Sequence, residues 1–367
     1  MIRPFVFLAL MARLALNPAQ AEVVIHPAPD GSTGRQMVIY STLDSRLAAP
    51  MIAAFQARRP DVSVRYEDLL AADIAARVIA ETDAGQPTAD FLFSSGMDLQ
   101  LKLANDGYAQ AAPVPAAASW PAWAKWQDTA FALTFEPAVL VYHKPAFPDG
   151  PPQSRLELMT WLRQTPGRAE TQMAAPLAPS PFGKIGTYDI AQSSVGYLFL
   201  ARDAEHFADI WSLLRVMSDA GLQTFPTSQD IIDRVVDGRL LLGYNILGSY
   251  AADEARLEPD LGLLLLRDYT VVVSRVALVP RAAAAPDLGA EFLGFLMGTE
   301  GQTLLSEKLR LPAVSLEVTG AGSGAAMQAA LGDQLRPVPV SPGVLVYLDQ
   351  AKRQRLLRLW QEALSQD

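Results

Sequence analysis

The amino-acid sequence predicts an α/β fold of two lobes joined by two crossings of the chain. Its 367 residues exceed the roughly 250 to 300 residues at which one hydrophobic core usually stops growing, so the core should divide. Half of the residues are hydrophobic and 19% are charged, which is the composition of a globular protein. Strand-like and helix-like segments alternate from Arg35 onward, a pattern typical of parallel sheets covered by helices.

The first lobe opens with a series of strand, helix, strand, helix and strand. Hydrophobic periodicity predicts strands at Met37 to Tyr40, Val62 to Tyr66 and Ala89 to Phe93, and helices at Leu47 to Arg58 and Ala71 to Asp83. The first and third strands run into small hydroxyl residues, Ser41-Thr42 and Ser94-Ser95-Gly96. Open α/β sheets bind their ligands at this end of the strands, so these residues are the first candidates for a site.

A break in an apolar region marks the expected first crossing between the lobes. Phe131 to His143 contains two apolar stretches that are separated by Glu136-Pro137. The second lobe, about residues 138–268, then follows as a new alternating series. Its predicted helices lie near Ser154 to Gln164, Ala191 to Arg202 and Ala208 to Ser218, and its predicted strands at Ile185 to Tyr188, Leu240 to Tyr244 and Leu261 to Leu266.

The chain is expected to return to the first lobe near residue 272. Val271 to Val279 predicts a strand, and the helical stretch Leu288 to Leu309 should pack back on that lobe. Lobe one would therefore comprise residues 36–134 and 272–311. Residues 312–367 would form a C-terminal extension on the outside. In it, the small residues of Ala321 to Ala330 predict a mobile connection, and Val344 to Leu364 predicts a terminal helix.

The N-terminus has the pattern of a cleavable secretory signal. Arg3 precedes the apolar stretch Phe5 to Leu16, and Ala19-Gln20-Ala21 stands just before Glu22. The apolar stretch is short for a transmembrane span and is interrupted by Arg13. We therefore expect a signal peptide over residues 1–21, cleavage after Ala21, and a soluble mature protein in the periplasm.

Composition and charge exclude several classes of function. The chain has no cysteine, so disulfides, thiolate metal sites and cysteine nucleophiles are impossible. The formal charge is −9, and removal of Arg3 and Arg13 with the signal lowers it by two, to −11. This charge argues against a nucleic-acid or anionic-membrane surface. A local anion site remains possible, since backbone amides at helix N-termini bind anions without any net positive charge.

Short motifs along the chain, taken in order, resemble one family. The string Val38-Ile39-Tyr40-Ser41-Thr42-Leu43-Asp44 resembles the opening of the periplasmic solute-binding proteins of ABC transporters that bind ferric iron or phosphate esters. Ala89-Asp90-Phe91, Leu133 to Pro137, Gly183 to Asp189, Ser193 to Tyr197, Gly243 to Tyr250 and Phe292 to Gln302 are similar to later segments of that family. The resemblance covers about residues 36–311 and comes closest to the phosphoglycerate-transport regulatory and hexose-phosphate binding proteins.

The resemblance implies both an architecture and a mode of action. It implies the two-lobe periplasmic-binding-protein-like fold of type II, which closes around a solute and catalyses nothing. The implied partners are an inner-membrane permease and ATPase, or the periplasmic domain of a sensor kinase. We expect a monomer that uses no cofactor and no metal and does not bind nucleic acid.

Hydroxyl residues near predicted helix starts are the main candidate ligand contacts. Hydroxyls and free amides there form an anion receptor, although the same residues are also the preferred N-caps. Asp44 would orient a ligand hydroxyl or complement a helix dipole, and Arg275 would hold an oxyanion or form a hinge salt bridge. Tyrosines would bracket the ligand or pack in the core. The candidate set is Ser41, Thr42, Asp44, Ser94, Ser95, Thr187, Tyr188, Ser193, Ser194, Tyr244, Asn245 and Arg275. The expected ligand is a small anionic solute such as an organic phosphate.

Two alternative functions stay open at this point. Ferric-iron binders of the family use adjacent tyrosines as ligands, whereas Tyr244 and Tyr250 are separated in this sequence. A hydrolase built only from carboxylates is also possible, although the three histidines lack metal-pair spacing and no G-x-S-x-G motif is present. A tyrosinate-to-iron colour would indicate the first alternative, and activity on phosphate esters would indicate the second.

Overall fold

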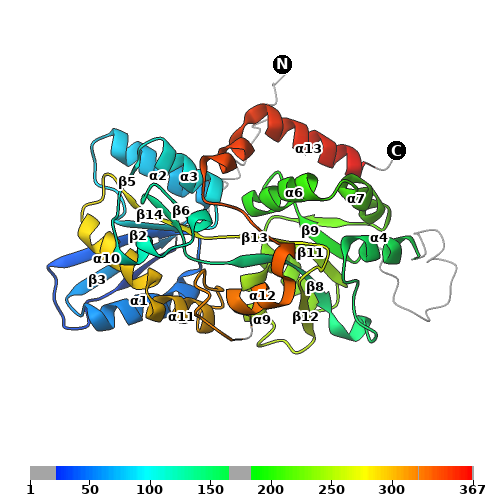
Figure 1. Ribbon diagram of the computed structural model, residues 1–367, viewed down its shortest axis with the longest axis horizontal. Helices are drawn as coiled ribbons and strands as arrows, with labels where there is room; N and C mark the ends of the chain where they lie inside the picture. Colours follow the sequence, from blue (N-terminus) through cyan, green and yellow to red (C-terminus); the bar gives the residue numbers. More distant parts are fainter. Residues whose placement is uncertain (1–21, 165–182, 321, 366–367) are drawn as a thin grey trace, which may run out of the picture.

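A computed structural model describes residues 22–164, 183–320 and 322–365. Two β-sheets, each covered by helices, form two lobes that lie side by side (Figure 1). The α/β two-lobe prediction is therefore confirmed. The predicted signal peptide lies outside the described residues. Among the helices that are described, none is both long and apolar enough to cross a membrane.

Lobe one is built on an eight-stranded sheet of order β1-β3-β2-β4-β14-β7-β6, with β5 paired to β14. β2 runs parallel to β3 and β4, whereas β14 runs antiparallel to β4. Phe55 and Phe91 each pack edge-on against Phe292 with ring centroids 5.0 Å apart, joining α1, the sheet and α10 on one face. The elements are β1 (Glu22–His26), β2 (Arg35–Ser41), α1 (Ser45–Arg58), β3 (Val62–Asp68), α2 (Ala71–Asp83), β4 (Phe91–Ser94), α3 (Met97–Asn105), β5 (Ala109–Gln110), β6 (Lys125–Trp126), β7 (Ala130–Ala132), β14 (Val276–Pro280), α10 (Pro286–Met297) and α11 (Thr299–Glu307).

Lobe two is built on a seven-stranded sheet of order β10-β9-β11-β8-β13-β15, with β12 paired to β8. β9 runs parallel to β10 and β11, so the chain crosses over through helices between these strands. The elements are β8 (Glu136–His143), α4 (Arg155–Arg163), β9 (Ile185–Tyr188), α6 (Ser194–His206), α7 (Ile210–Asp219), β10 (Gln223–Phe225), α8 (Ser228–Val236), β11 (Leu242–Leu247), α9 (Gly248–Glu254), β12 (Leu261–Leu264) and β13 (Thr270–Val273).

Both expected crossings between the lobes are present, but each is displaced by a few residues. The first lies between β7 and β8, so Glu136 already begins a strand of lobe two. The second lies at Ser274-Arg275, because the single strand expected at Val271 to Val279 is two strands in different sheets. Leu133 N donates to Arg275 O over 3.0 Å, so the two crossings run side by side and form the hinge.

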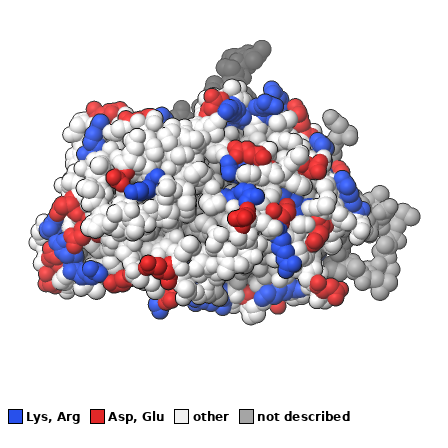
Figure 2. Space-filling view, in the orientation of Figure 1, with Lys and Arg blue, Asp and Glu red and all other residues white. Residues whose placement is uncertain are grey.

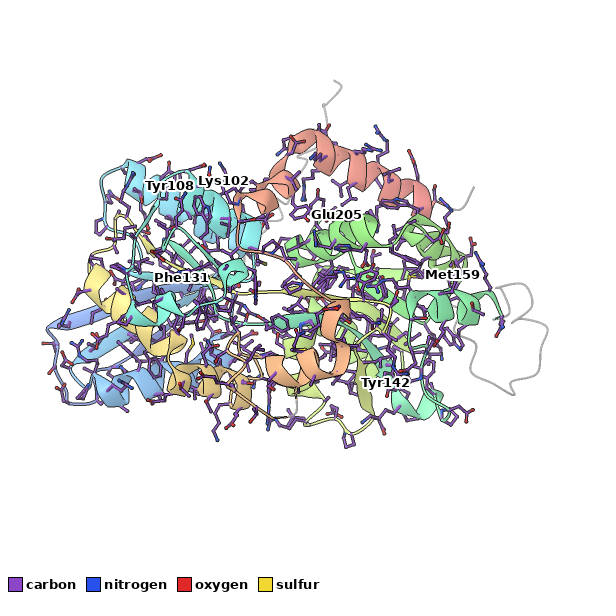
Figure 3. The ribbon with its side chains drawn as sticks, in the orientation of Figure 1. Lys102, Tyr108, Phe131, Tyr142, Met159 and Glu205 are labelled. Atoms are coloured by element: carbon purple, nitrogen blue, oxygen red, sulfur yellow. The ribbon has the colours of Figure 1, made fainter. Side chains whose placement is uncertain are left out.

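The C-terminal extension attaches to both lobes. β15 (Leu335–Pro337) joins the lobe-two sheet beside β13, the 3₁₀ helix Pro342–Leu348 packs on α3 of lobe one, and α13 (Gln350–Leu364) packs on α7 of lobe two. Figures 1 and 3 show α13 lying across the top of lobe two, above the helix that carries Glu205. The Tyr347 hydroxyl donates to Glu205 Oε1 over 3.0 Å.

The expected mobile connection at Ala321 to Ala330 is instead largely helical. α12 (Gly324–Leu331) begins at the N-cap Ser323, whose hydroxyl accepts from Ala326 N over 3.1 Å. Residue 321 lies outside the described residues. The prediction was wrong because alanine, although small, has the strongest helix propensity.

Candidate functional site

A cavity lined by residues of both sheets lies between the two lobes. It has a volume of about 560 Å³. Every segment that lines it follows a strand: β2, β3 and β4 in lobe one, and β9, β10 and β11 in lobe two. This is the position in which open α/β sheets bind ligands. We call the residues Thr42, Asp44, Arg46, Leu47, Asp68, Leu69, Leu70, Ala71 and Ser95 the lobe-one wall, and the remaining lining residues the lobe-two wall.

The structure places half of the candidate residues in this lining and half behind it. Thr42, Asp44, Ser95, Tyr188, Ser193 and Ser194 line the cavity. Ser41, Ser94, Thr187, Tyr244, Asn245 and Arg275 do not belong to the lining, and all six are buried.

The three buried hydroxyls hold the local backbone in place. Ser41 Oγ donates to Phe93 O over 2.7 Å and accepts from Leu43 N, which fixes the loop after β2. Ser94 Oγ accepts from Gly96 N over 3.1 Å, and Thr187 Oγ1 donates to Tyr244 O over 3.0 Å. These hydroxyls shape the loops that form the cavity.

Tyr244 and Asn245 belong to a buried ionic network in the core of lobe two. Asp203, fully buried, accepts from Tyr244 OH over 2.7 Å and from Asn245 Nδ2 over 2.6 Å. Arg155 Nη2 donates to the same carboxylate over 2.9 Å, and Arg155 Nε donates to Tyr244 OH over 2.8 Å. Asn245 has a φ of 59° at an irregularity in the pairing of β11 with β8, a conformation that asparagine tolerates better than most residues. Burial raises the pKa of Tyr244 well above its ordinary value.

Arg275 connects the hinge to the cavity wall. Its Nε lies 3.3 Å from Glu136 Oε1, and both side chains are about 1% exposed, so the hinge carries a buried ion pair. Its Nη1 donates to Thr42 Oγ1 over 3.1 Å, and Thr42 Oγ1 also accepts from Ser95 N. Burial lowers the pKa of Arg275, but Glu136 and Tyr250 outweigh that effect and raise the pKa above its ordinary value. The hinge salt bridge that the sequence left open is therefore present.

On the lobe-two wall, backbone amides at the starts of two helices have no hydrogen-bond acceptor within their helix. α6 begins after the N-cap Ser193, whose hydroxyl accepts from Gly196 N, and α8 begins after the N-cap Thr227, whose hydroxyl accepts from Asp230 N. The first two amides of each helix have no intrahelical acceptor. These amides belong to Ser194, Val195, Ser228 and Gln229, and all four residues line the cavity.

The lobe-one wall combines carboxylates with leucines. Asp44 and Asp68 line it, and neither carboxylate has a hydrogen-bond or ion-pair partner among the described residues. Leu70, two residues after Asp68, is 68% exposed, so the wall presents an apolar surface next to the carboxylates. Burial raises the pKa of Asp68 to about 6, and the negative charges of Asp44 and Glu22 act in the same direction. The positive charge of Arg275 acts in the opposite direction but does not outweigh them.

Asp68→Asn is expected to stabilise the ligand-free protein at neutral pH. The pKa of this aspartate is about 4 in the unfolded chain and about 6 in the folded protein. The folded protein therefore loses stability as the pH rises through this range and the carboxyl ionises. Asparagine removes that loss. Thermal unfolding of wild type and variant between pH 4 and pH 8 should show a gain at pH 7 that vanishes near pH 4. A gain of equal size at both pH values would contradict the assignment.

One ion pair joins the two walls at the cavity. Arg46 Nη2 of lobe one lies 3.4 Å from Asp253 Oδ2 of lobe two, and Asp253 also pairs with Arg256. Arg46 is 73% exposed, so this pair contributes little to stability. It shows that the lobes approach closely enough for side chains to meet across the cavity.

Sequence reasoning missed the α8 start and Asp68. The signal for α8 was present: Thr227 precedes Asp230 by three residues, close to the capping-box pattern, and follows the strand β10. Asp68 ends a strand whose neighbour Glu67 pairs with Arg65 and Arg77, and no local pattern separates the paired carboxylate from the free one.

Among the described residues, no group of three or more His, Asp or Glu could hold a metal ion. The two tyrosines considered as iron ligands are also not brought together as ligands. Tyr250 lines the cavity, whereas the hydroxyl of Tyr244 is occupied by Asp203 and Arg155 in the core.

Comparison with known proteins identifies the family. Residues 50–329 match the family of bacterial extracellular solute-binding proteins. The chain is 53% identical to the substrate binding protein of the ABC transporter from Agrobacterium tumefaciens, with a TM-score of 0.86, coverage of 95% of this chain and 100% of that chain. A search of curated proteins found no match.

Two more distant structures share the fold alone. The periplasmic binding protein AfuA from Actinobacillus pleuropneumoniae, with fructose-6-phosphate bound, is 15% identical with a TM-score of 0.68, over 90% of this chain and 99% of that one. Iron-bound HitA from Pseudomonas aeruginosa is 16% identical with a TM-score of 0.63, over 90% and 99%. These matches confirm the two-lobe periplasmic-binding-protein fold expected from the sequence. The chain belongs to the family of bacterial extracellular solute-binding proteins.

Proposed function

We propose that this protein is the periplasmic solute-binding component of an ABC uptake system and that it binds a small organic oxyanion, such as a phosphate ester, between its lobes. The observation that carries the ligand class is the convergence of four free amides, from Ser194, Val195, Ser228 and Gln229, on one cavity. Amides at a helix N-terminus donate hydrogen bonds where the helix dipole also favours negative charge.

The size of the cavity supports an organic solute over a bare inorganic ion. A volume of about 560 Å³ lies in the range of pockets for small organic ligands. Ser95, whose hydroxyl is bonded to that of Thr42, offers a further polar group from the opposite wall, so a solute can contact both lobes at once. Contacts that exist only when the lobes are together would favour the closed state.

The 53% identical relative from an ABC transporter supports the transport assignment. The partners would then be a permease and an ATPase in the inner membrane, and a sensor kinase is the alternative partner for the same closed form. Capture of the permease by ligand-loaded protein, and not by ligand-free protein, tests this assignment.

Export with cleavage after Ala21 is part of the same proposal. Glu22 to His26, the residues directly after the proposed cleavage point, pair with β3 in the lobe-one sheet. N-terminal sequencing of the exported protein should find Glu22 first, and a chain that still begins at Met1 would contradict cleavage.

Ser194→Pro tests the amide site directly. Proline is well tolerated at the first position of a helix, and Ser193 before it has an extended backbone that proline permits. The substitution therefore removes one amide donor and keeps the helix. If that amide bonds a charged oxygen, we expect affinity for the best phosphate ester of a thermal-shift screen to fall roughly 10- to 100-fold.

Ser194→Ala is the matched control, because it removes the hydroxyl and keeps the amide. Equal affinity of the proline variant and wild type, measured by titration calorimetry, would contradict the oxyanion site. A screen in which only ferric complexes raise the melting temperature would favour the iron alternative instead.

A further inference from the structure

We infer that the oxyanion belongs to a zwitterionic solute, whose ammonium group is bound by Asp44 and Asp68 on the lobe-one wall. The inference rests on the proposed function, because it assigns the other end of the same ligand. It follows from the lining, which has free amides on the lobe-two wall and the unpaired carboxylates of Asp44 and Asp68 on the lobe-one wall.

The charge of the lining is the first argument. Asp44, Asp68, Asp253 and Glu254 line the cavity, and Arg46 is the only lysine or arginine among the described lining residues. Arg46 is already paired with Asp253. Arg275 lies behind the wall and is paired with Glu136. The formal charge of the lining is thus −3, one positive against four negative groups. A purely anionic solute would meet net repulsion there.

The second argument is that the carboxylates of Asp44 and Asp68 have no hydrogen-bond or ion-pair partner among the described residues. Ionised carboxylates that are partly removed from water are normally paired or hydrogen-bonded. Asp253 follows that rule through its two arginines, whereas Asp68, which is half-buried, has no such partner among the described residues. Asp44 is exposed, and its charge acts on Asp68. An ammonium group is the partner that offers several charge-assisted hydrogen bonds to both.

The apolar neighbours decide between an ammonium and a sugar. Leu47, Leu69 and Leu70 stand beside the two carboxylates on the lobe-one wall. A polyol would bring hydroxyls against these leucines and leave some of them unpaired. A short alkyl chain that ends in an ammonium group places methylenes on the leucines and its charge on the aspartates. The solute class is therefore an aminoalkyl phosphate or a related aminoalkyl oxyanion.

Three probes of similar size test the inference with the mature protein by titration calorimetry at pH 7.5. Ethanolamine phosphate carries the ammonium, propyl phosphate replaces it by a methyl group, and glycerol 3-phosphate replaces it by hydroxyls. We expect ethanolamine phosphate to bind at least roughly 10-fold more tightly than the other two, as a charge-assisted contact requires. In the double variant Asp44→Asn and Asp68→Asn, this preference should disappear, while affinity for propyl phosphate is kept or rises because two negative charges are gone.

Asp73→Asn is the matched control, because Asp73 lies in the first turn of α2, close to Asp68 in sequence, but is not part of the lining. It should leave the preference unchanged. Equal affinity for the three probes, or a preference for glycerol 3-phosphate, would overturn the ammonium assignment and leave the oxyanion site standing. Binding of none of them, with a shift only by non-phosphate solutes, would overturn the proposed function itself.

Discussion

Asp203→Ala is expected to destabilise the protein by about 3 to 5 kcal/mol, because it leaves a buried arginine without its main counter-charge. Asp203 accepts four hydrogen bonds: from Arg155, Tyr244, Asn245 and Tyr269. Arg155 is about 1% exposed and stacks 3.7 Å from the centre of the Tyr269 ring, so water cannot replace the lost carboxylate. Its other ion-pair partner, Asp268, lies at the edge of the network and is 26% exposed.

Denaturant unfolding of the variant checks this expectation. Asp209→Ala is the control, because Asp209 is exposed at the N-cap of α7 and its side chain makes no cap bond. It should cost less than about 1 kcal/mol. Combining Asp203→Leu with Arg155→Met should recover part of the loss, since apolar residues often replace a buried ion pair at little cost. An Asp203→Ala loss as small as that of the control would show that the network is not what stabilises lobe two.

Glu136→Ala is expected to have an effect of similar size, about 3 to 5 kcal/mol, at the hinge. It leaves Arg275 buried without a counter-charge and removes the acceptor for Thr134 Oγ1 and Ser249 Oγ. Because Ser249 lies beside the wall residue Tyr250 and Arg275 bonds the wall residue Thr42, the same change should also weaken ligand-induced stabilisation.

Thermal unfolding with and without ligand separates the two effects of Glu136→Ala. Glu136→Gln keeps the shape and can still accept from a hydroxyl, so it isolates the loss of charge. If glutamine restores stability fully, the ion pair with Arg275 is dispensable and the hydrogen bonds of Glu136 are what matter. Wild-type stability of the alanine variant would contradict the role of the pair altogether.

Local patterns were sufficient to predict most of the elements that form the cavity. Met37 to Tyr40 and Val62 to Tyr66 read as strands, and Ala71 to Asp83 coincides with α2. The hydroxyl residues that follow β2 and β4 were candidates for the site, and two of them, Thr42 and Ser95, line the cavity. These features depend on residues that are close in sequence, which is why the sequence contains them.

The fate of individual polar side chains depends on distant partners. Tyr244 turns away from the cavity because Arg155 and Asp203, 89 and 41 residues away in the chain, occupy its hydroxyl. Ser41 and Thr42 are neighbours, yet one points to Phe93 O in the core and the other lines the cavity. The second crossing had a signal in the sequence, because the polar residues Ser274-Arg275 interrupt an apolar segment. Periodicity alone does not show that the chain passes from one sheet to the other at this point.

Both signs of charge are interspersed over the visible face of the molecule, without a large patch of one sign (Figure 2). The local excess of acidic side chains described above lies on the cavity wall.

The C-terminal extension has a consequence for how the protein loses its structure. β15 belongs to the lobe-two sheet, the 3₁₀ helix Pro342–Leu348 packs on lobe one, and α13 packs again on lobe two. Two lobes joined only by a hinge would melt as separate units, each at its own temperature. Here each lobe holds part of one continuous extension, so the unfolding of either lobe also loosens the segment that is anchored on the other. We therefore expect the extension to couple the unfolding of the two lobes and to reduce the population of species in which only one lobe is folded.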